Sequence, residues 1–255
     1  MLCAWRAGRP PLRRDSLGGT LCRSPQLARA TKGEITRITS SQLFRISGLA
    51  LLVGAVAFIL HVVARSVITA GPDLVTFARE GLWVPINVLG VVGATLVLLG
   101  LPAMYARIAG LGGLLALVGV ALIAVAWMFF GVFLSLFSLL LAPWLADRAP
   151  SLVAASAPLP AAFIIAFVAG LIAEVVGAVL LAIPFIRGRA QPRWVGFALP
   201  TSALLAVVGT LIAPNGPSAD VAINLLSNLG PVVLLVALGD LGFRMWSEHA
   251  PGNAP

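Results

Sequence analysis

Charged residues are scarce in this sequence: they make up 10% of the 255 residues, whereas hydrophobic residues make up 60%. A soluble domain is typically about a quarter charged and about half apolar. A globular fold in water must keep a polar exterior, and this chain has too few polar residues to supply one. The mean hydropathy of +1.03 agrees. The composition excludes an ordinary soluble domain and indicates a protein whose solvent is the lipid bilayer.

Cysteine and histidine are also nearly absent, with two residues of each. Cys3 and Cys22 cannot build a disulfide scaffold, and neither CxxC nor HExxH, the spacings of common zinc sites, occurs. There is no phosphate-binding loop, nucleophile elbow or pair of carboxylates. A single histidine within an apolar run cannot supply both axial ligands of a b-type haem. The sequence therefore indicates no metal and no cofactor, and it carries no signature of an enzyme.

The net charge of +8 is concentrated in one segment. Residues 1–45 hold nine of the 17 basic residues and only two acids. This segment is rich in Arg, Ser, Gly and Pro and has no sustained periodicity, which predicts a disordered cytoplasmic tail. It lacks the interleaved aromatic residues of a nucleic-acid-binding surface. We therefore expect no nucleic-acid partner, and we expect the tail to set the membrane topology and contact anionic lipid.

Long apolar runs dominate the rest of the chain. A transmembrane helix needs about 20 mainly apolar residues. Six runs reach this length without the strict alternation of β-strands; they are residues 46–68, 82–105, 111–142, 161–186, 194–213 and 221–243. The predicted fold class is all-α: a polytopic membrane protein with a bundle of six transmembrane helices across residues 46–245. Residues 246–255 form a short cytoplasmic C-terminal tail in this prediction.

The third run is too long for a simple crossing. Residues 111–142 would form a helix of about 48 Å, whereas the hydrocarbon core is about 30 Å thick. The helix must therefore tilt, break or project beyond the membrane. Pro143 is expected to end it, because proline disrupts a continuing helix.

Arginine placement predicts that both chain ends lie in the cytoplasm. With the N-terminal tail inside, five basic residues outside the tail fall on the inner side: Arg107, Arg187, Arg189, Arg193 and Arg244. Only Arg65, Arg79 and Arg148 fall on the outer side. This excess follows the positive-inside rule.

Tryptophan supports the same span ends. Four of the six tryptophans fall at predicted helix ends, where an aromatic belt meets the lipid headgroups: Trp83, Trp144, Trp194 and Trp246. We expect these rings to act as membrane-interface anchors. Pairs of glycines within the runs, such as Gly48 and Gly54, are expected to allow close helix approach.

Glu174 is the main candidate for a functional residue. It is near the middle of the fourth run, where an ionised carboxylate costs about 2.5–3.5 kcal/mol on insertion scales. Intramembrane acids often mark proton or ion pathways. The alternative is a protonated carboxyl that forms a hydrogen bond between helices.

A second group of polar residues completes the candidate site. His61 and Arg65 share one face of the first helix. The sixth run opens with a polar stripe that includes Asn224 and Asn228, followed by Gly230-Pro231. Proline at that position frees the carbonyl of Ser227 and is expected to kink the helix. Such stripes either join helices or line a water-filled cavity.

Three short stretches carry a family resemblance: residues 45–52, 82–85 and 101–107. With these stretches the chain resembles small six-helix bacterial membrane proteins of the DUF4386 type, over roughly residues 44–245. The resemblance implies a six-helix fold in the bacterial cytoplasmic membrane. It supplies no catalytic residues.

The sequence leaves three functions open. The first is a structural or regulatory membrane protein, such as a partner subunit, in contact with the bilayer and with a second copy or another membrane subunit. The second is a small proton-coupled carrier that uses Glu174, together with His61, Asn224 and Asn228. The third is an intramembrane enzyme that acts on lipid, for which too few polar residues share one depth.

Overall fold

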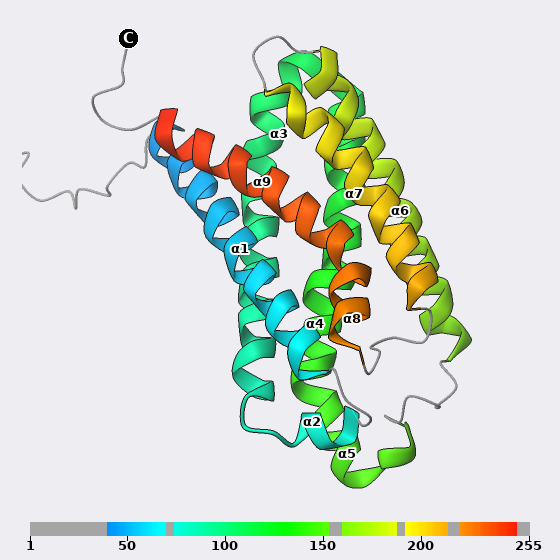
Figure 1. Ribbon diagram of the computed structural model, residues 1–255. Coiled ribbons are helices and arrows are strands. Elements are labelled where there is room, and N and C mark those ends of the chain that lie inside the picture. The colour runs from blue at the N-terminus through cyan, green and yellow to red at the C-terminus, as the bar shows by residue number, and fades with distance from the viewer. Residues whose placement is uncertain (1–39, 70–73, 153–159, 188–191, 214–219, 249–255) are drawn as a thin grey trace, which may run out of the picture. The chain divides into compact units, whose positions relative to one another are not determined.

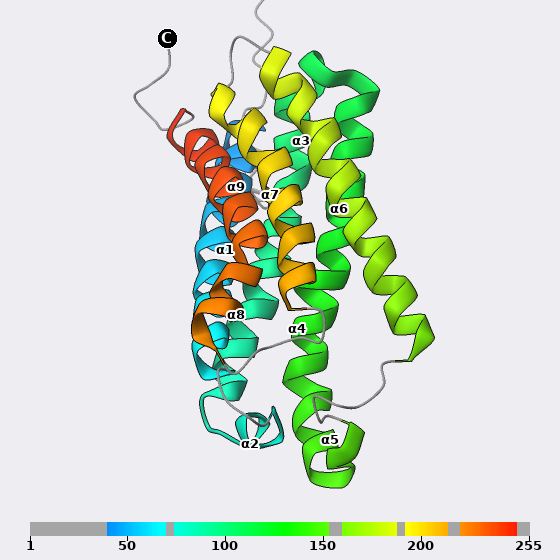
Figure 2. The same ribbon diagram turned by 45° about the vertical axis from the view of Figure 1, so that its right-hand side comes forward.

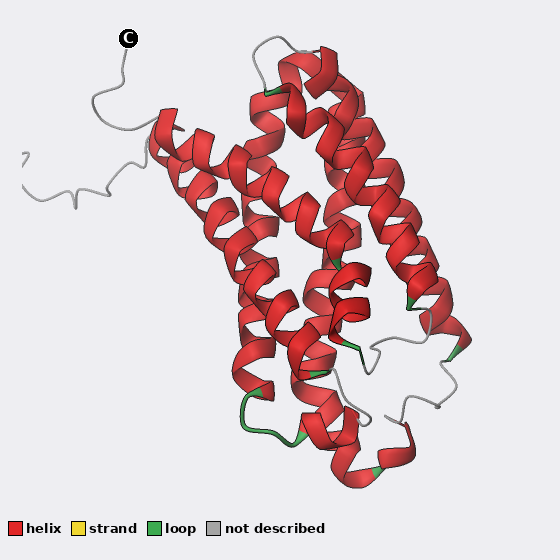
Figure 3. Cartoon of the chain, viewed as in Figure 1, coloured by secondary structure: helices red, strands yellow, loops and turns green. Residues whose placement is uncertain are grey.

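The computed structural model describes residues 40–69, 74–152, 160–187, 192–213 and 220–248. Within these ranges every regular element is helical and no strand occurs (Figure 3). Five helical segments are long and apolar enough to cross a membrane; they are Ser41–Ile68, Trp83–Arg148, Ala161–Arg187, Arg193–Ile212 and Leu229–Glu248. The chain is therefore an all-α, multi-pass membrane bundle.

The segment Trp83–Arg148 is a helical hairpin. Its 66 residues would extend about 99 Å as one straight helix, about three times the thickness of a hydrocarbon core. Helix α3 (Trp83–Trp127) contains one non-helical residue, Gly113, with φ 50° and ψ −129°. The chain reverses direction at Gly113. The evidence is a contact between residues on either side of it: Trp83 Nε1 donates a hydrogen bond to Ser138 O at 2.7 Å. Residues 83–112 form a first leg and residues 114–148 a second, antiparallel leg.

The hairpin gives the bundle six long helical legs; the sequence predicts six transmembrane spans, and the number of legs that cross a membrane stays a prediction. The others are α1 (Ser40–Ile68), α6 (Ala161–Arg187), α7 (Arg193–Ile212) and the pair α8 (Val221–Ser227) and α9 (Leu229–Glu248). Helix α1 packs against the first leg and α9, and α6 packs against the second leg and α7 (Figure 1). Helix α7 also packs against α9, which closes the bundle.

Proline does not end the second leg, contrary to the prediction for Pro143. The leg contains two π-helical stretches, Met128–Phe133 and Phe137–Leu141, and it continues through α5 (Ala142–Arg148). Pro143 lacks the N–H that would bond to the carbonyl four residues earlier. The wider π-helical turn directly before it already changes that hydrogen-bond pattern, so the helix accommodates the ring. The predicted irregularity of the third run thus takes the form of π-helical turns.

The last leg is broken where the sequence predicts a kink. Asn228, between α8 and α9, has φ −98° and ψ 5°. Pro231 supplies no N–H to the carbonyl of Ser227, and that carbonyl packs directly against Gly209 of α7. A side chain at Gly209 would collide with the Ser227 backbone, so the broken helix and the glycine belong to one close contact.

Glycines allow the other legs to approach closely, as the sequence predicts. A Cβ added at Gly54 would lie 2.7 Å from the backbone nitrogen of Val97. A Cβ added at Gly48 would lie 2.8 Å from the carbonyl oxygen of Gly242. No real Cβ occupies such positions, so these crossings depend on residues without side chains.

The outer surface of the bundle is largely apolar, and a few polar side chains are buried within a mainly apolar interior. Large apolar side chains point outward along every leg, including Ile165 at 69% exposure, Leu204 at 64% and Leu211 at 74%. Buried polar residues such as Asn87 and Ser202 lie inside. A soluble protein rarely carries such continuous apolar surface, whereas lipid tails solvate it.

Two names define the ends of the bundle. The basic end holds the start of α1, the hairpin turn, the end of α6, the start of α7 and the end of α9. Three contacts bring these helix ends together: Arg107 forms a hydrogen bond with Glu248, Gly112 packs against Pro184, and Gly196 packs against Ile186. The loop end holds α2 (Leu74–Ala78) and α5, where Arg79 Nε lies 3.1 Å from Asp147 Oδ1. Figure 2 shows α2 and α5 at this end from a second side.

The predicted tails differ slightly from the helix bounds. Helix α1 begins at Ser40 and α9 ends at Glu248, so residues 40–45 and 246–248 are helical rather than tail. Helices in membranes commonly extend beyond the hydrocarbon core with polar residues at their ends. The predicted disorder of residues 1–39 and the end of the C-terminal tail, 249–255, lie outside the described residues.

Candidate functional site

Glu174 faces the interior of the bundle from the middle of α6. Its side of the helix also carries Gly170, which contacts Phe130, and Gly177, which contacts Ile123 of the second leg. Glu174 is only 6% exposed, and no hydrogen bond or ion pair joins it to another described residue. An ionised carboxylate there would be both desolvated and unpaired, which costs several kcal/mol.

His61 is packed between α1 and the first leg. Its Nδ1 donates a hydrogen bond to Ile86 O at 2.8 Å, because a carbonyl oxygen can only accept. The ring lies on Gly90: a Cβ there would be 2.8 Å from His61 Cε1. The residue is 3% exposed and contacts the Phe58 ring at a centroid distance of 5.2 Å. The imidazole therefore joins two helices.

Asn224 and Asn228 join α8 to α1. Asn224 Nδ2 donates to Ser66 O at 3.3 Å, and Asn228 Nδ2 lies 3.4 Å from Ser66 Oγ. Asn228 Nδ2 also donates to the backbone oxygen of Asn224 at 2.7 Å. Asp220 caps α8 by accepting a hydrogen bond from Ala222 N at 2.7 Å. The sequence leaves two roles open for this polar stripe, joining helices or lining a water-filled cavity. The contacts described here join helices.

The four candidate residues do not form one site. His61, Asn224 and Asn228 bind around the part of α1 nearest the loop end, whereas Glu174 lies on α6 against the second leg. Apolar rings fill the space beside His61: Phe58 contacts Trp127 at 4.9 Å. Ile123 and Phe130 of the second leg contact Gly177 and Gly170 of α6. Trp127 lies between the first two residues in sequence and Glu174 between the last two, so the apolar Trp127 ring lies on the side of the second leg that faces Glu174. No described hydrogen bond connects Glu174 with the other three residues.

Three of the predicted tryptophan anchors lie at the surface. Trp144 is 58% exposed, and Trp194 and Trp246 are also partly exposed. Trp83 is different, with 1% exposure. Its Nε1 is bonded to Ser138, and the guanidinium of Arg65 lies 5.7 Å from its ring centre. Trp83 is therefore an interior ring that joins both legs of the hairpin and α1, because its indole N–H finds a carbonyl partner inside.

The predicted topology-setting arginines gather at the basic end. Arg107 forms an ion pair with Glu248 at 2.7 Å, and Arg244 forms one with Asp240 at 2.9 Å. Arg187 and Arg193 are exposed at the facing ends of α6 and α7. Arg189 lies outside the described residues. The basic side chains thus share one end, as the positive-inside pattern requires.

Asn87 is an interior polar residue that the site prediction omitted. It is fully buried, and its Nδ2 donates to Trp83 O at 2.8 Å, while Oδ1 has no partner. By the antiparallel pairing of the two legs it faces the region of Ser135, which is also buried. A signal existed in the sequence: Asn87 is four residues after Trp83 and three before Gly90, so all three share one helix face.

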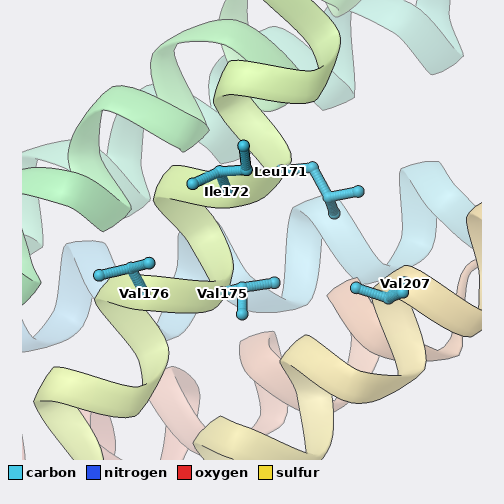
Figure 4. Close-up of a pocket in the computed structure, with 5 residues that line it drawn as sticks. All are labelled: Leu171, Ile172, Val175, Val176 and Val207. Carbon is cyan, nitrogen blue, oxygen red and sulfur yellow. The ribbon is translucent and has the colours of Figure 1, made fainter.

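The surface of the bundle carries an apolar groove. The groove lies between α6 and α7, has a volume of about 260 Å³ and is lined by Leu171, Ile172, Val175, Val176 and Val207 (Figure 4). Every lining side chain is aliphatic, so the groove suits a lipid chain better than an ion. Among the described residues no three His, Cys, Asp or Glu side chains gather as metal ligands.

Comparison of the chain with protein-family models, with curated proteins and with solved structures finds no match. The resemblance to DUF4386-type proteins therefore stays a prediction, and the assignment of function rests on the contacts described above.

Proposed function

We propose that this chain is a structural or regulatory protein of a bacterial cytoplasmic membrane, acting as a partner subunit. The observation that carries the proposal is the use of the polar residues: His61, Asn224 and Asn228 are engaged in contacts between helices. A carrier needs polar groups that are free to exchange water or substrate. Here most of these groups hold the bundle together.

The partners in this proposal are the bilayer and a second membrane-embedded subunit, either another copy or a different chain. The exposed apolar residues of α6 and α7 give such a subunit a surface to pack against. Association in lipid depends on shape and packing, because lipid tails solvate the same surface equally well. We propose no nucleic-acid partner.

The proposed orientation places both chain ends in the cytoplasm. It is supported by the described arginines at the two ends. The basic end has five, namely Arg45, Arg107, Arg187, Arg193 and Arg244, and the loop end has three at or near it, namely Arg65, Arg79 and Arg148. The positive-inside rule assigns the richer end to the cytoplasm. The hairpin turn and the loop between α6 and α7 would then also lie there.

Substitutions at Glu174 test the proposal. Glu174→Ala should lower the stability of the bundle by about 1–3 kcal/mol, the range of most disruptive single changes, because it removes a packed interior side chain. Glu174→Gln keeps the shape and should leave stability nearly unchanged. Thermal unfolding in detergent and the oligomeric state on size exclusion measure both effects, and the exposed Glu80→Gln is the matched control.

Measurement of proton flux in proteoliposomes can contradict the proposed structural role. If the protein carries protons, and Glu174→Gln abolishes that flux while expression and folding stay normal, the structural role is wrong. The proposal expects no flux above empty liposomes for the natural chain or for either variant.

Two observations favour a proton-coupled carrier as the second candidate. Glu174 is buried without a described partner, and the α8–α9 leg is broken, as carrier helices often are near their ion sites. A pathway in this reading would require a dimer, because six legs around a packed centre leave no polar passage. Flux that is unchanged in Glu174→Gln would remove the role of Glu174 in this candidate, and an absence of flux in the natural chain would remove the candidate itself.

A further inference from the structure

Arg45 is a half-buried cation without a counter-charge. It lies in the second turn of α1 at the basic end, and its Nε is buried and has no hydrogen-bond partner. No ion pair among the described residues includes it. A guanidinium has five N–H donors and remains charged at any pH that the protein meets. A buried donor without an acceptor costs free energy, so an external acceptor is expected.

The acids at this end are already paired. Glu248 binds Arg107 and Asp240 binds Arg244, at 2.7 and 2.9 Å. Asp240 and Glu248 are the described acids at the basic end, and each has a closer arginine than Arg45. The missing anion must therefore come from outside the described part of the chain.

Arg45 lies at the depth of lipid headgroups. Twenty residues separate it from Arg65 on the same helix. At 1.5 Å per residue this is about 30 Å, the thickness of the hydrocarbon core. The two arginines therefore mark the two membrane interfaces, and Arg45 is at the level of phosphate groups.

The surroundings of Arg45 suit a phospholipid. One turn further along α1, Gly48 lets α9 approach so closely that a Cβ there would be 2.9 Å from Trp246 N. Trp246 and Phe243 are partly exposed beside this crossing, with ring centres 6.0 Å apart. Leu49 is exposed below Arg45 on α1. A cation at headgroup depth thus stands above aromatic and aliphatic side chains that acyl chains can cover, beside helices α1 and α9, which lie side by side in Figure 1.

We propose that Arg45 binds the phosphate of an anionic phospholipid, whose acyl chains lie along the α1–α9 crossing beside Phe243 and Trp246. A planar guanidinium matches a phosphate with two parallel hydrogen bonds. Basic positions between transmembrane helices at the cytoplasmic surface are typical binding places for such lipids. The site is separate from Glu174 and independent of the proposed function.

The test compares lipid-dependent stabilisation of the purified full-length chain. Phosphatidylglycerol should raise the thermal unfolding midpoint in detergent more than phosphatidylcholine does. Arg45→Gln should weaken the apparent affinity for phosphatidylglycerol about tenfold, which corresponds to about 1.4 kcal/mol. Arg187→Gln is the matched control, because Arg187 is an exposed arginine at the basic end of α6, which Figures 1 and 2 place on the opposite side of the bundle from α1.

Three results would overturn the proposal. One is equal phosphatidylglycerol affinity in Arg45→Gln and the natural chain. Another is an equal loss in Arg187→Gln, which shows a general charge effect. The third is full stabilisation by inorganic phosphate alone, which assigns the site to a free anion. If Arg45→Gln does not fold, native mass spectrometry of the natural chain decides: retained phosphatidylglycerol but not phosphatidylcholine supports the site, and equal retention refutes it.

Discussion

At the scale of single residues, polar side chains inside this bundle connect helices that are far apart in sequence. Asn224 reaches Ser66 across 158 positions, and His61 reaches Ile86 across 25. The bilayer core contains no water that could form hydrogen bonds with these groups, so their hydrogen-bond partners lie within the bundle. The residue type is visible in the sequence, because Asn and His are rare in apolar runs. Their partners are backbone oxygens, which every residue has, and no residue pattern identifies them.

The Asn224 contact predicts a modest loss of stability on truncation. Asn224→Ala removes the hydrogen bond to Ser66 O, and such bonds between membrane helices average about 0.6 kcal/mol, with a maximum of about 1.7. We expect Asn224→Ala to lower the unfolding free energy in mixed detergent by about 1 kcal/mol. Thr201→Ala is the control, since the exposed Thr201 hydroxyl bonds only within its own helix and its loss should have no measurable effect. A stability unchanged in both variants would show that α1 and α8 are not joined this way.

Trp83 and Glu174 show where reasoning from residue type reaches its limit. The position of Trp83 at a span end predicts an interfacial ring, yet the fold buries it because Ser138 O lies within reach. The depth of Glu174 and the cost of lipid exposure require it to face the interior, find a partner or stay protonated, and the structure buries it without a described partner. The burial of a charged residue follows from its depth in the membrane. Whether a tryptophan at a span end is interfacial or buried depends on which helix lies beside it.

At the scale of helices, the sequence predicts the legs and the kink before Pro231 but not the π-helical turns. The predicted fourth run, 161–186, differs from α6 by one residue at one end, and the predicted fifth run, 194–213, differs from α7 by one residue at each end. The length of residues 111–142 predicts some irregularity, but π-helical turns depend on how backbone carbonyls pair and carry no side-chain pattern. The glycine cluster before residue 114 is the visible sign of the reversal at Gly113.

The reversal predicts that Gly113 tolerates no side chain. Its φ of 50° with ψ −129° belongs to a region that other residues avoid. Gly113→Ala should destabilise the hairpin by about 1–3 kcal/mol through backbone strain alone, because nothing lies within 4 Å of an added Cβ.

Gly110→Ala separates strain from crowding in the same measurement. Gly110 is helical and also has open space around its Cβ position. Alanine there should be neutral or slightly stabilising, since alanine favours helix more than glycine does. Equal unfolding free energies for the two variants would contradict the reversal at Gly113.

At the scale of the whole molecule, the arrangement follows from the solvent. The apolar exterior, the glycine-rich crossings and the arginines at one end each have a physical reason in a bilayer. The all-α class could be predicted because composition alone imposes it. The distance between Glu174 and the other polar residues could not be predicted. It depends on which legs pack together, and the order and length of the apolar runs do not determine that.

The location of the two chain ends tests the central claim most directly, namely that the chain folds as six legs with the hairpin at Gly113. The two cysteines, Cys3 and Cys22, both precede α1 and report the N-terminal side through a membrane-impermeant maleimide in intact cells. A reporter fused after Pro255, active only on one side of the membrane, reports the other end. Six crossings predict both ends on one side of the membrane, and the arginine distribution predicts that this side is the cytoplasm, with the thiols labelled only after lysis. Ends on opposite sides would mean an odd number of crossings and would contradict the hairpin.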